Sequence, residues 1–331
     1  MTFSDANDLF EAISKLKILV IGDVMVDSYV FGGVSRISPE APVPIVLATK
    51  KEKRLGGAAN VALNVQALGA TPILCAIVGD DIDGEFFLKR LKERNIPGKG
   101  VIVSSDRQTT VKERVLSGAH QLLRVDYETD KALSAIEQKS LLAHIKNLLP
   151  ECDAVIFEDY DKGVINKTII SETIAEANRL GIPTVVDPKK RNFLDYKGAT
   201  LFKPNLKELK EGLKIECDPT DLESVKAGAK ALQEVLNAQM IMITLSEHGV
   251  FIKDNGDTHL IPAHIRQISD VSGAGDTVIS IVACGLAAGL DAKRTAALAN
   301  LGGGLVCEHV GVVPIDKDDL AKEANDQKIF D

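Results

Sequence analysis

The stretch "DVSGAGDTV", residues 270–278, combines residue types that suit phosphate chemistry. Gly273, Ala274 and Gly275 carry almost no side chain, so their backbone N–H groups can converge on an anion. An apolar, helix-like segment follows, and a helix N-terminus adds about half a positive charge. Asp276 also suits a helix cap, but a cap requires one residue rather than a row of small ones. The pattern favours an anion-binding loop, whose positive field is expected to keep Asp276 ionised.

Two further motifs place small or polar residues at the start of a helix. In "RLGGAANVALN", Gly56 and Gly57 permit close approach of another group, and Asn60 follows one turn into the helix. Tight packing of that helix on a sheet explains the glycines equally well. In "LFKPNLKELKEG", Asn205 ends a strand and Glu208 follows three residues later. A capping box explains this pair, and a role beside a metal-bound phosphate is the alternative.

Several other cofactor-binding motifs are missing from the sequence. The first strand leads into "IGDVMVDSYVFGG", which lacks the GxGxxG of a dinucleotide fold, and the sequence contains no GxxxxGK[ST] of a P-loop. The glycines of "NLGGGLV" follow a helical run and indicate close helix packing. The turn in "ITLSEHGVFI" is a candidate floor for a nucleotide site. The cysteines and histidines show no zinc-ligand spacing.

The elements that would position these motifs alternate along the chain. Near-continuous apolar runs such as "KILVIGD" and "CDAVIFEDY" alternate with amphipathic stretches such as "NKTIISETIAEANRLG". This order predicts a mostly parallel sheet covered by helices on both faces. Ligands bind beyond the carboxyl ends of such strands, so one crevice is expected beside the polar strand ends Asp23, Asp80, Asp159, Asp187, Asn205 and Thr244.

Two segments, about residues 24–51 and 108–126, interrupt this rhythm with alternating, β-like patterns. Both are too long for plain loops. They predict a small β-sheet that projects from the ligand end of the main sheet and acts as a lid. We therefore expect a single domain over residues 1–331 that carries this lid.

The composition limits the classes of partner. The net charge is −8 and the basic residues are dispersed, which disfavours binding to nucleic acid. No apolar run approaches the ~20 residues needed to span a bilayer, and the first residues lack the basic-then-apolar order of a signal peptide. We expect a cytoplasmic protein whose partners are small molecules, without membrane association.

Taken in order, these motifs resemble those of the ribokinase-like carbohydrate kinases, the PfkB family. The segment from Gly56 to Asn60 and the loop from Asp270 to Asp276 match the two family signatures, and Asn205 with Glu208 matches its Asn-x-x-Glu motif. The resemblance covers essentially the whole chain and implies a three-layer α/β/α, ribokinase-like fold. It also implies transfer from ATP, with Asp276 as general base and Gly273, Ala274 and Gly275 as the anion hole.

The resemblance assigns further residues to nucleotide, metal and sugar. Asn205 and Glu208 would organise Mg²⁺ through water, and Asp270 would bind a monovalent cation such as K⁺. The residues expected to border ATP are Lys203, Asn205, Glu208, Thr244, Ser246 and Gly249. Those expected to surround the sugar under the lid are Asp23, Asp27, Gly56, Gly57, Asn60 and Asp187. The candidates for holding a substrate phosphate are Arg36, Lys112, Arg114 and Lys189, although a solvated surface charge explains each one as well.

Within the family, "SRISPEAPVP" and "TTVKERVLSGAHQLLRVDYE" resemble the kinases of heptose 7-phosphate, which act in ADP-heptose and lipopolysaccharide synthesis. This implies phosphorylation of the anomeric O1 of D-glycero-D-manno-heptose 7-phosphate to the 1,7-bisphosphate. One departure is Ser28, where this group often carries arginine. Some relatives continue into a nucleotidyltransferase, whose HxGH-type motif is missing here, so the kinase-only form is expected.

Three other functions are alternatives. A PfkB kinase for another sugar, sugar phosphate or nucleoside fits every motif except the lid sequence. A non-catalytic sugar-binding protein would be expected to lose Asp276, and a dinucleotide-dependent oxidoreductase would need the GxGxxG turn. An apolar, alternating lid is typical of a surface shared with a second copy, so we expect a homodimer through the lid.

Overall fold

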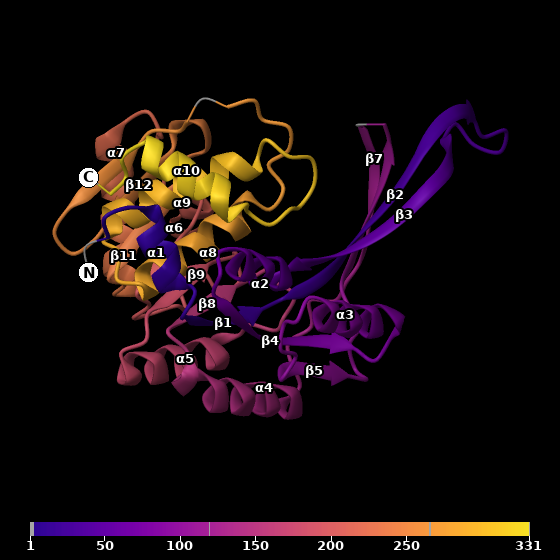
Figure 1. Ribbon diagram of the computed structural model, residues 1–331. Helices are drawn as coiled ribbons and strands as arrows, with labels where there is room; N and C mark the ends of the chain where they lie inside the picture. Colours follow the sequence, from indigo (N-terminus) through magenta and orange to yellow (C-terminus); the bar gives the residue numbers. More distant parts are fainter. Residues whose placement is uncertain (1–2, 119, 265, 331) are drawn as a thin grey trace.

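A computed structural model describes residues 3–118, 120–264 and 266–330. Of the predicted domain, residues 1–2, 119, 265 and 331 lie outside the described residues, and residue 119 belongs to the second predicted lid segment. Within the described ranges the strands form two sheets, one large and one small (Figure 1).

The large sheet has the strand order β13-β12-β11-β10-β9-β8-β1-β4-β5. Its strands pair in parallel from β11 to β5, and β12 and β13 are antiparallel additions at one edge. The strand bounds are β1 Lys17–Gly22, β4 Thr71–Gly79, β5 Gly100–Ser104, β8 Ala154–Glu158, β9 Thr184–Asp187, β10 Leu201–Phe202, β11 Met240–Thr244, β12 Val250–Lys253 and β13 Thr258–Ile261.

Helices cover both faces of this sheet, and β1 shows why a central strand is apolar after its first residue, Lys17. Side chains alternate across a strand, so Ile18 and Val20 join one hydrophobic core while Leu19 and Ile21 join the other. Figure 1 shows α4 and α5 on one face and α2 and α8 on the other. The helix bounds are α1 Ala6–Ile13, α2 Ala58–Ala67, α3 Ile82–Glu93, α4 Ala135–Leu148, α5 Lys167–Leu180, α6 Leu206–Leu213, α7 Leu222–Leu236, α8 Ala274–Ala287, α9 Ala292–Val306 and α10 Lys317–Asp326, with 3₁₀ turns at Leu149–Glu151 and Ser246–His248.

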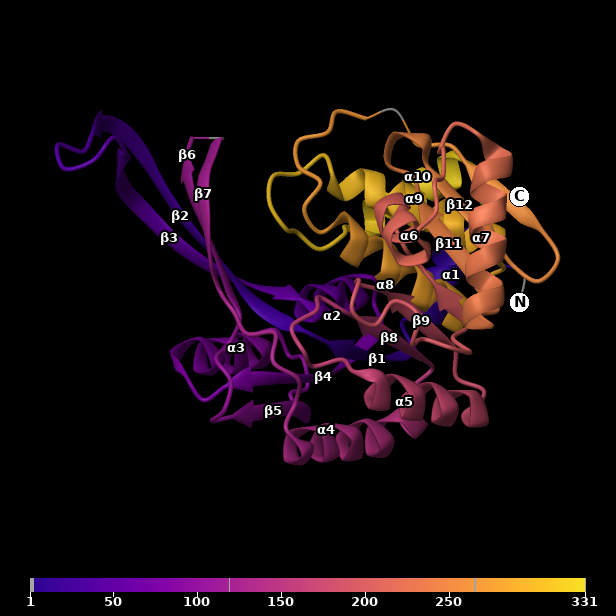
Figure 2. The same cartoon turned by 180° about the vertical axis from the view of Figure 1, so that it is seen from behind.

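The small sheet is built from the two segments that interrupt the α/β rhythm. Its order is β3-β2-β6-β7, with β2 and β6 parallel and the two outer pairs antiparallel. Figures 1 and 2 show it extending from the body as an arm. Its strands are β2 Val24–Ile37, β3 Pro44–Gly57, β6 Val111–Ser117 and β7 His120–Tyr127. The predicted fold class is confirmed, and β3 runs six residues beyond the predicted end at residue 51.

The glycines of "NLGGGLV" pack helices together, as the sequence predicts. They lie inside α9, where a Cβ at Gly302 would overlap Ile281 and one at Gly303 would crowd Val278, both on α8. This close approach sets α8 firmly on α9. None of the described helices is both long and apolar enough to cross a bilayer.

Candidate active site

The polar residues at the carboxyl ends of neighbouring central strands of the large sheet lie close together. Asp187 ends β9, Glu158 ends β8 and Asp23 follows β1, and these three strands are adjacent. The N-terminus of α8 lies over these strand ends, because Asp187 Oδ2 is 3.5 Å from the position that a Cβ of Gly275 would occupy. The predicted strand-end crevice and the predicted anion loop therefore belong to one site.

The loop before α8 leaves amides available at this site. Gly273 is the N-cap residue with a φ of 83°, which L-residues rarely adopt, and a Cβ there would lie 3.3 Å from Asn60 Nδ2. The Ala274 amide donates to the Val271 carbonyl at 3.3 Å. Within the described chain, the amides of Gly275 and Asp276 have no acceptor, as is usual for a first helical turn.

Asp270 closes the other side of this loop. Its two carboxylate oxygens accept the amides of Ser272 and Gly311, each at 2.9 Å. Burial opposes the charge, but these hydrogen bonds lower the pKa of Asp270 overall. Asp270 thus ties the anion loop to the chain after α9 as a partly exposed carboxylate, the donor type that suits a hard cation.

Asp276 is held by two neutral donors. Asn60 Nδ2 donates to its Oδ2 at 2.7 Å, and the Tyr160 hydroxyl donates to its Oδ1 at 2.9 Å. Burial raises the pKa of Asp276 to about 6, although both hydrogen bonds act to lower it. We expected the loop's positive field to dominate; desolvation of a side chain that is almost fully enclosed outweighs it. The result is a carboxylate that is ionised at neutral pH yet readily protonated.

Helix α2 is fixed against α8 beside this carboxylate. Asn64 accepts the Thr277 hydroxyl at 3.0 Å, and Ser280 Oγ reaches the Val61 carbonyl at 3.2 Å. At the start of α2, Gly57 has a φ of 59°, and a Cβ on Gly56 would overlap the Asp27 carboxylate. The glycines therefore permit close approach of the chain at the start of β2, and Asn60 contacts Asp276.

Asp23 organises the turn after β8. Its carboxylate accepts the amides of Tyr160, Lys162 and Val164 at 2.9–3.1 Å, and the residue is 1% exposed. Burial and nearby Asp159 raise its pKa to about 6. Both oxygens are engaged by the backbone, and a contact between Asp23 and a sugar stays a prediction.

One face of the small sheet turns charged and aromatic side chains toward the core. Arg114 donates to Asp27, and both Arg114 and Arg54 lie over the Tyr29 ring, at 5.4 and 5.0 Å from its centroid. Ser28 lies on the opposite face, where its hydroxyl donates to Glu113 at 3.0 Å. Ser28, which stands where the heptose 7-phosphate kinases often carry arginine, therefore does not change the face of the sheet that carries Asp27.

The four cations proposed for a substrate phosphate lie in different places. Lys112 pairs with Asp126 and Glu128 at 3.0 and 3.2 Å, beside Arg114 on β6. Lys189 instead lies 2.7 Å from Glu208, on the nucleotide side of the site. Arg36 is exposed toward the far end of β2. The structure brings Lys112 and Arg114 together and leaves the other two apart from them.

The Asn-x-x-Glu motif forms a capping box and a charge pair at once. Asn205 Oδ1 accepts the Glu208 amide and Glu208 Oε2 accepts the Asn205 amide, each at 2.8 Å. Burial disfavours the charged form of Lys189, but Asp187 and Glu208 more than compensate and raise its pKa. Lys203 and Asp187 form a second, buried pair at 2.8 Å. Because Glu208 is already neutralised by Lys189, it suits a cation held through water better than a direct ligand.

The remaining nucleotide candidates form a turn beside this motif. Thr244 ends β11 and bridges to Asn205, and its amide donates to the Pro204 carbonyl at 3.1 Å. Ser246 is exposed with a φ of 53°, and a Cβ on Gly249 would overlap the Ile261 carbonyl. This tight turn lies where the sequence predicts the floor of a nucleotide site.

Two residues of the site escape sequence reasoning. Tyr160 reaches Asp276 from 116 residues away, and its position just after a strand is the only signal of its role. Glu158 is buried with Oε2 unpartnered among the described residues, and burial, Asp187 and Asp276 raise its pKa well above the usual range. The neighbouring strand-end residue, Asp159, instead accepts Asn192 and Tyr196 in the core.

Comparison with known proteins agrees with this geometry. Residues 15–318 match the family model described as "pfkB family carbohydrate kinase". The chain is 40% identical over 312 residues to "Bifunctional protein HldE" of Methylobacillus flagellatus, covering 94% of this chain and 64% of the relative. For the protein of the same name from Wolinella succinogenes, identity is 38% over 305 residues, with 92% and 64% covered. The chain thus spans less than two thirds of these relatives.

Solved structures share the fold. Phosphofructokinase-2 from Escherichia coli in complex with potassium superposes with a TM-score of 0.77 at 19% identity, covering 95% of this chain and 98% of that one. A putative ribokinase from Agrobacterium tumefaciens gives a TM-score of 0.74 at 17% identity, with 95% and 98% covered. The family match, covering most of the chain, and the site around Asp276 lead to one conclusion: the chain belongs to the pfkB family of carbohydrate kinases, which transfer a phosphoryl group from ATP to a sugar.

Proposed function

We propose that the protein phosphorylates the anomeric O1 of D-glycero-D-manno-heptose 7-phosphate with ATP, giving heptose 1,7-bisphosphate for ADP-heptose and lipopolysaccharide synthesis in the cytoplasm. The observation that best supports the kinase activity is that Asp276, in the first turn of α8, is buried. The sugar is supported by relatives that are 35–40% identical and carry the name HldE.

Asp276 is the proposed general base. Asn60 and Tyr160 hold one oxygen each, so the carboxylate is oriented before a substrate arrives. A pKa of about 6 leaves it mostly ionised at neutral pH and close to the value at which proton transfer is efficient. Of the predicted anion hole, Gly273 to Gly275, the Ala274 amide already donates to Val271, so the amides of Gly275 and Asp276 would donate hydrogen bonds to the migrating phosphoryl group.

The nucleotide would lie beyond β10 and β11. Lys203, Asn205, Thr244, Ser246 and Gly249 surround that region, and ATP phosphates there would face the N-terminus of α8. Mg²⁺ would neutralise those phosphates when bound. Glu208 and Asn205 would orient its water shell, since their oxygens already take part in the capping box and the Lys189 pair. Asp270 would contribute to a K⁺ site; a structural relative was solved with potassium.

The sugar would lie between the small sheet and the core, against Asp27, Gly57, Asn60 and Asp187. In this proposal the small sheet is a lid. Its other face exposes Leu123, Val125 and Tyr127, with 50%, 37% and 52% of each residue accessible. These apolar side chains form one exposed row along β7, which supports the proposed homodimer through this face.

A coupled ADP-release assay with a panel of sugars and sugar phosphates tests the proposal. We expect heptose 7-phosphate to give the highest kcat/KM; a preference for fructose 6-phosphate, ribose or adenosine would select another PfkB substrate instead. Asp276→Ala should abolish turnover while ATP still binds. Near-normal ADP production by this variant would exclude Asp276 as the base.

A further inference from the structure

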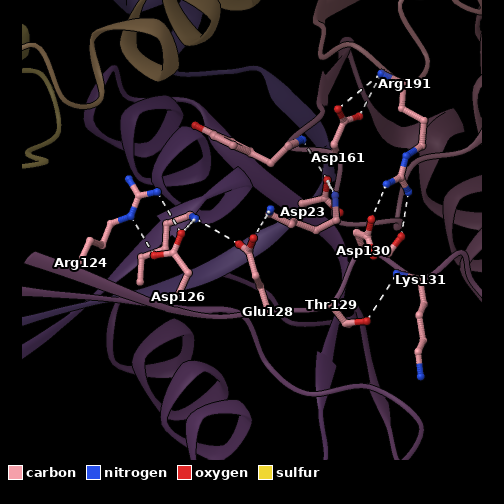
Figure 3. A network of polar contacts seen from close by, with 12 residues as sticks. Asp23, Arg124, Asp126, Glu128, Thr129, Asp130, Lys131, Asp161 and Arg191 are labelled. Carbon is pink, nitrogen blue, oxygen red and sulfur yellow. Dashed lines mark hydrogen bonds and ion pairs between the residues drawn. The ribbon is translucent and has the colours of Figure 1, made fainter.

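One carboxylate, Glu128, joins a lysine of the small sheet to a lysine of the core. Lys112 Nζ on β6 lies 3.2 Å from Glu128 Oε2, and Lys162 Nζ in the turn after β8 lies 2.8 Å from Oε1. Figure 3 shows this cluster, with Asp126 and Arg124 at its other end. The lysine side chains are 13% and 18% exposed, whereas Glu128 is 30% exposed. The carboxylate is therefore the member that can most easily leave.

The cluster is attached to the same turn that orients the base. Asp23 accepts the amides of both Tyr160 and Lys162 through one oxygen. From this turn the Tyr160 side chain reaches Asp276, while the Lys162 side chain reaches Glu128. In the proposed pose, with O1 at Asp276 beneath the small sheet, the far end of the sugar would be directed along this turn toward the lysines.

The charges of the cluster match a phosphate monoester. Lys112, Lys162 and Arg124 are cationic, and Asp126 pairs with both Lys112 and Arg124. Without Glu128 the group keeps three cationic side chains and one anionic side chain, an excess of two positive charges. A phosphate monoester carries about −1.5 to −2 at neutral pH and offers three acceptor oxygens, enough for both lysines at once.

We propose that Glu128 holds the place of the substrate's phosphate, and that Lys112 and Lys162 bind this phosphate when Glu128 swings out. This inference rests on the proposed function, in that it names the residues that make a sugar phosphate the preferred substrate. The other candidate cations are less suitable, since Arg114 is committed to Asp27 and Tyr29, and Lys189 to Glu208. We call Lys112 and Lys162 together the clamp. Lys162, which is not among the residues predicted from the sequence, is its member from the core.

Kinetics with two acceptors, heptose 7-phosphate and unphosphorylated heptose, test the clamp. Lys162→Ala and Lys112→Ala should each raise KM for heptose 7-phosphate about 10- to 100-fold, the range expected for a lost hydrogen bond between charged groups. Their KM for heptose should stay near the wild-type value. Lys131→Ala is the matched control, because Lys131 lies three residues from Glu128 and Figure 3 shows its side chain pointing away from it.

A second variant, at Glu128, distinguishes two roles of this carboxylate: occupying the position of the substrate phosphate, or only linking the small sheet to the core. Glu128→Gln removes the competing charge, so KM for heptose 7-phosphate should fall by about two- to fivefold, and inorganic phosphate should bind more tightly in calorimetry. A carboxylate that only fastens the small sheet would instead raise KM for both acceptors when removed. That result, or unchanged discrimination in Lys162→Ala, would overturn the clamp while leaving the proposed function intact. A wild-type enzyme that uses both acceptors equally well would overturn the proposed function itself.

Discussion

Replacing Tyr160 by Phe should move the pH dependence of catalysis and leave the alkaline rate nearly unchanged. The substitution removes the hydroxyl that donates to Asp276 Oδ1 at 2.9 Å and keeps the ring beneath Lys189. This hydrogen bond is one of the two that lower the pKa of Asp276 against the effect of burial. Without it the carboxylate loses part of what stabilises its charge, so its pKa must rise.

The size of the shift follows from the strength of the lost bond. A hydrogen bond to a charged group contributes about 1.5–3 kcal/mol, and one pKa unit corresponds to about 1.4 kcal/mol. The pKa of Asp276 should therefore rise from about 6 by about one to two units. For a rise of about one unit, the ionised fraction near pH 6 falls from about a half to about a tenth, a loss of about fivefold in kcat/KM. Well above pH 8 the two enzymes should differ little.

The assay is kcat/KM for ADP release measured across the pH range, because this parameter reports the ionisation of the free enzyme. The phosphates of the substrates also titrate, but they do so identically for both enzymes, so the difference isolates Asp276. Tyr196→Phe is the matched control: its buried hydroxyl donates to Asp159 at 2.8 Å, away from the base. An acid limb that is unmoved in Tyr160→Phe, or that moves equally in Tyr196→Phe, would refute the assignment of Asp276 as a base poised by Tyr160.

Three further predictions address stability, the sugar site and assembly. Because burial raises the pKa of Asp276 from 3.8 to about 6, its contribution to stability is complete below pH 3.8 and is lost, by about 3 kcal/mol, as pH rises through 6. Asp276→Asn should therefore raise Tm near pH 8 and change it little near pH 4, and calorimetry showing the reverse order would contradict the desolvation argument. Gly56→Ala would force a Cβ into the Asp27 carboxylate, so KM for the sugar should rise at least about tenfold, whereas Gly33→Ala, with open space around its Cβ, should leave KM unchanged. Val125→Glu, on the exposed face of β7, should convert a dimer into a monomer in analytical ultracentrifugation, and a wild-type enzyme that is already monomeric would remove the basis for the dimer.

The sequence predicts the layers well because local patterns encode them, whereas the anion-binding role of the loop before α8 stays a prediction. Continuous apolar runs such as residues 18–21 are typical of strands buried on both faces, and small residues before a helix are typical of an anion site. The family resemblance adds the order of the motifs. The resemblance does not show which side chains contact each motif in the folded protein.

Tyr160, Glu158 and Lys162 illustrate that limit. Each lies at the end of β8 or in the turn after it, where the sequence predicts only that polar residues gather. Which of them faces Asp276, the core or Glu128 depends on hydrogen bonds such as those that the Asp23 carboxylate accepts from the turn, which connect residues more than a hundred positions apart. The raised pKa of Asp276 is not predicted for a related reason: it comes from burial, which is a property of the assembled structure.

The root of the small sheet has a mechanical consequence. Asp23 is the single residue between β1 and β2, and β3 ends at Gly57, which is already the N-cap of α2. At these two of its connections the arm joins the core without a flexible linker, so a tilt of β2 and β3 would reach the first turn of α2 directly. Asn60 lies in that turn and donates to Asp276. If the proposed sugar site is right, a sugar that displaced the arm would also shift Asn60 and so change the pKa of Asp276, which would couple binding to activation of the base.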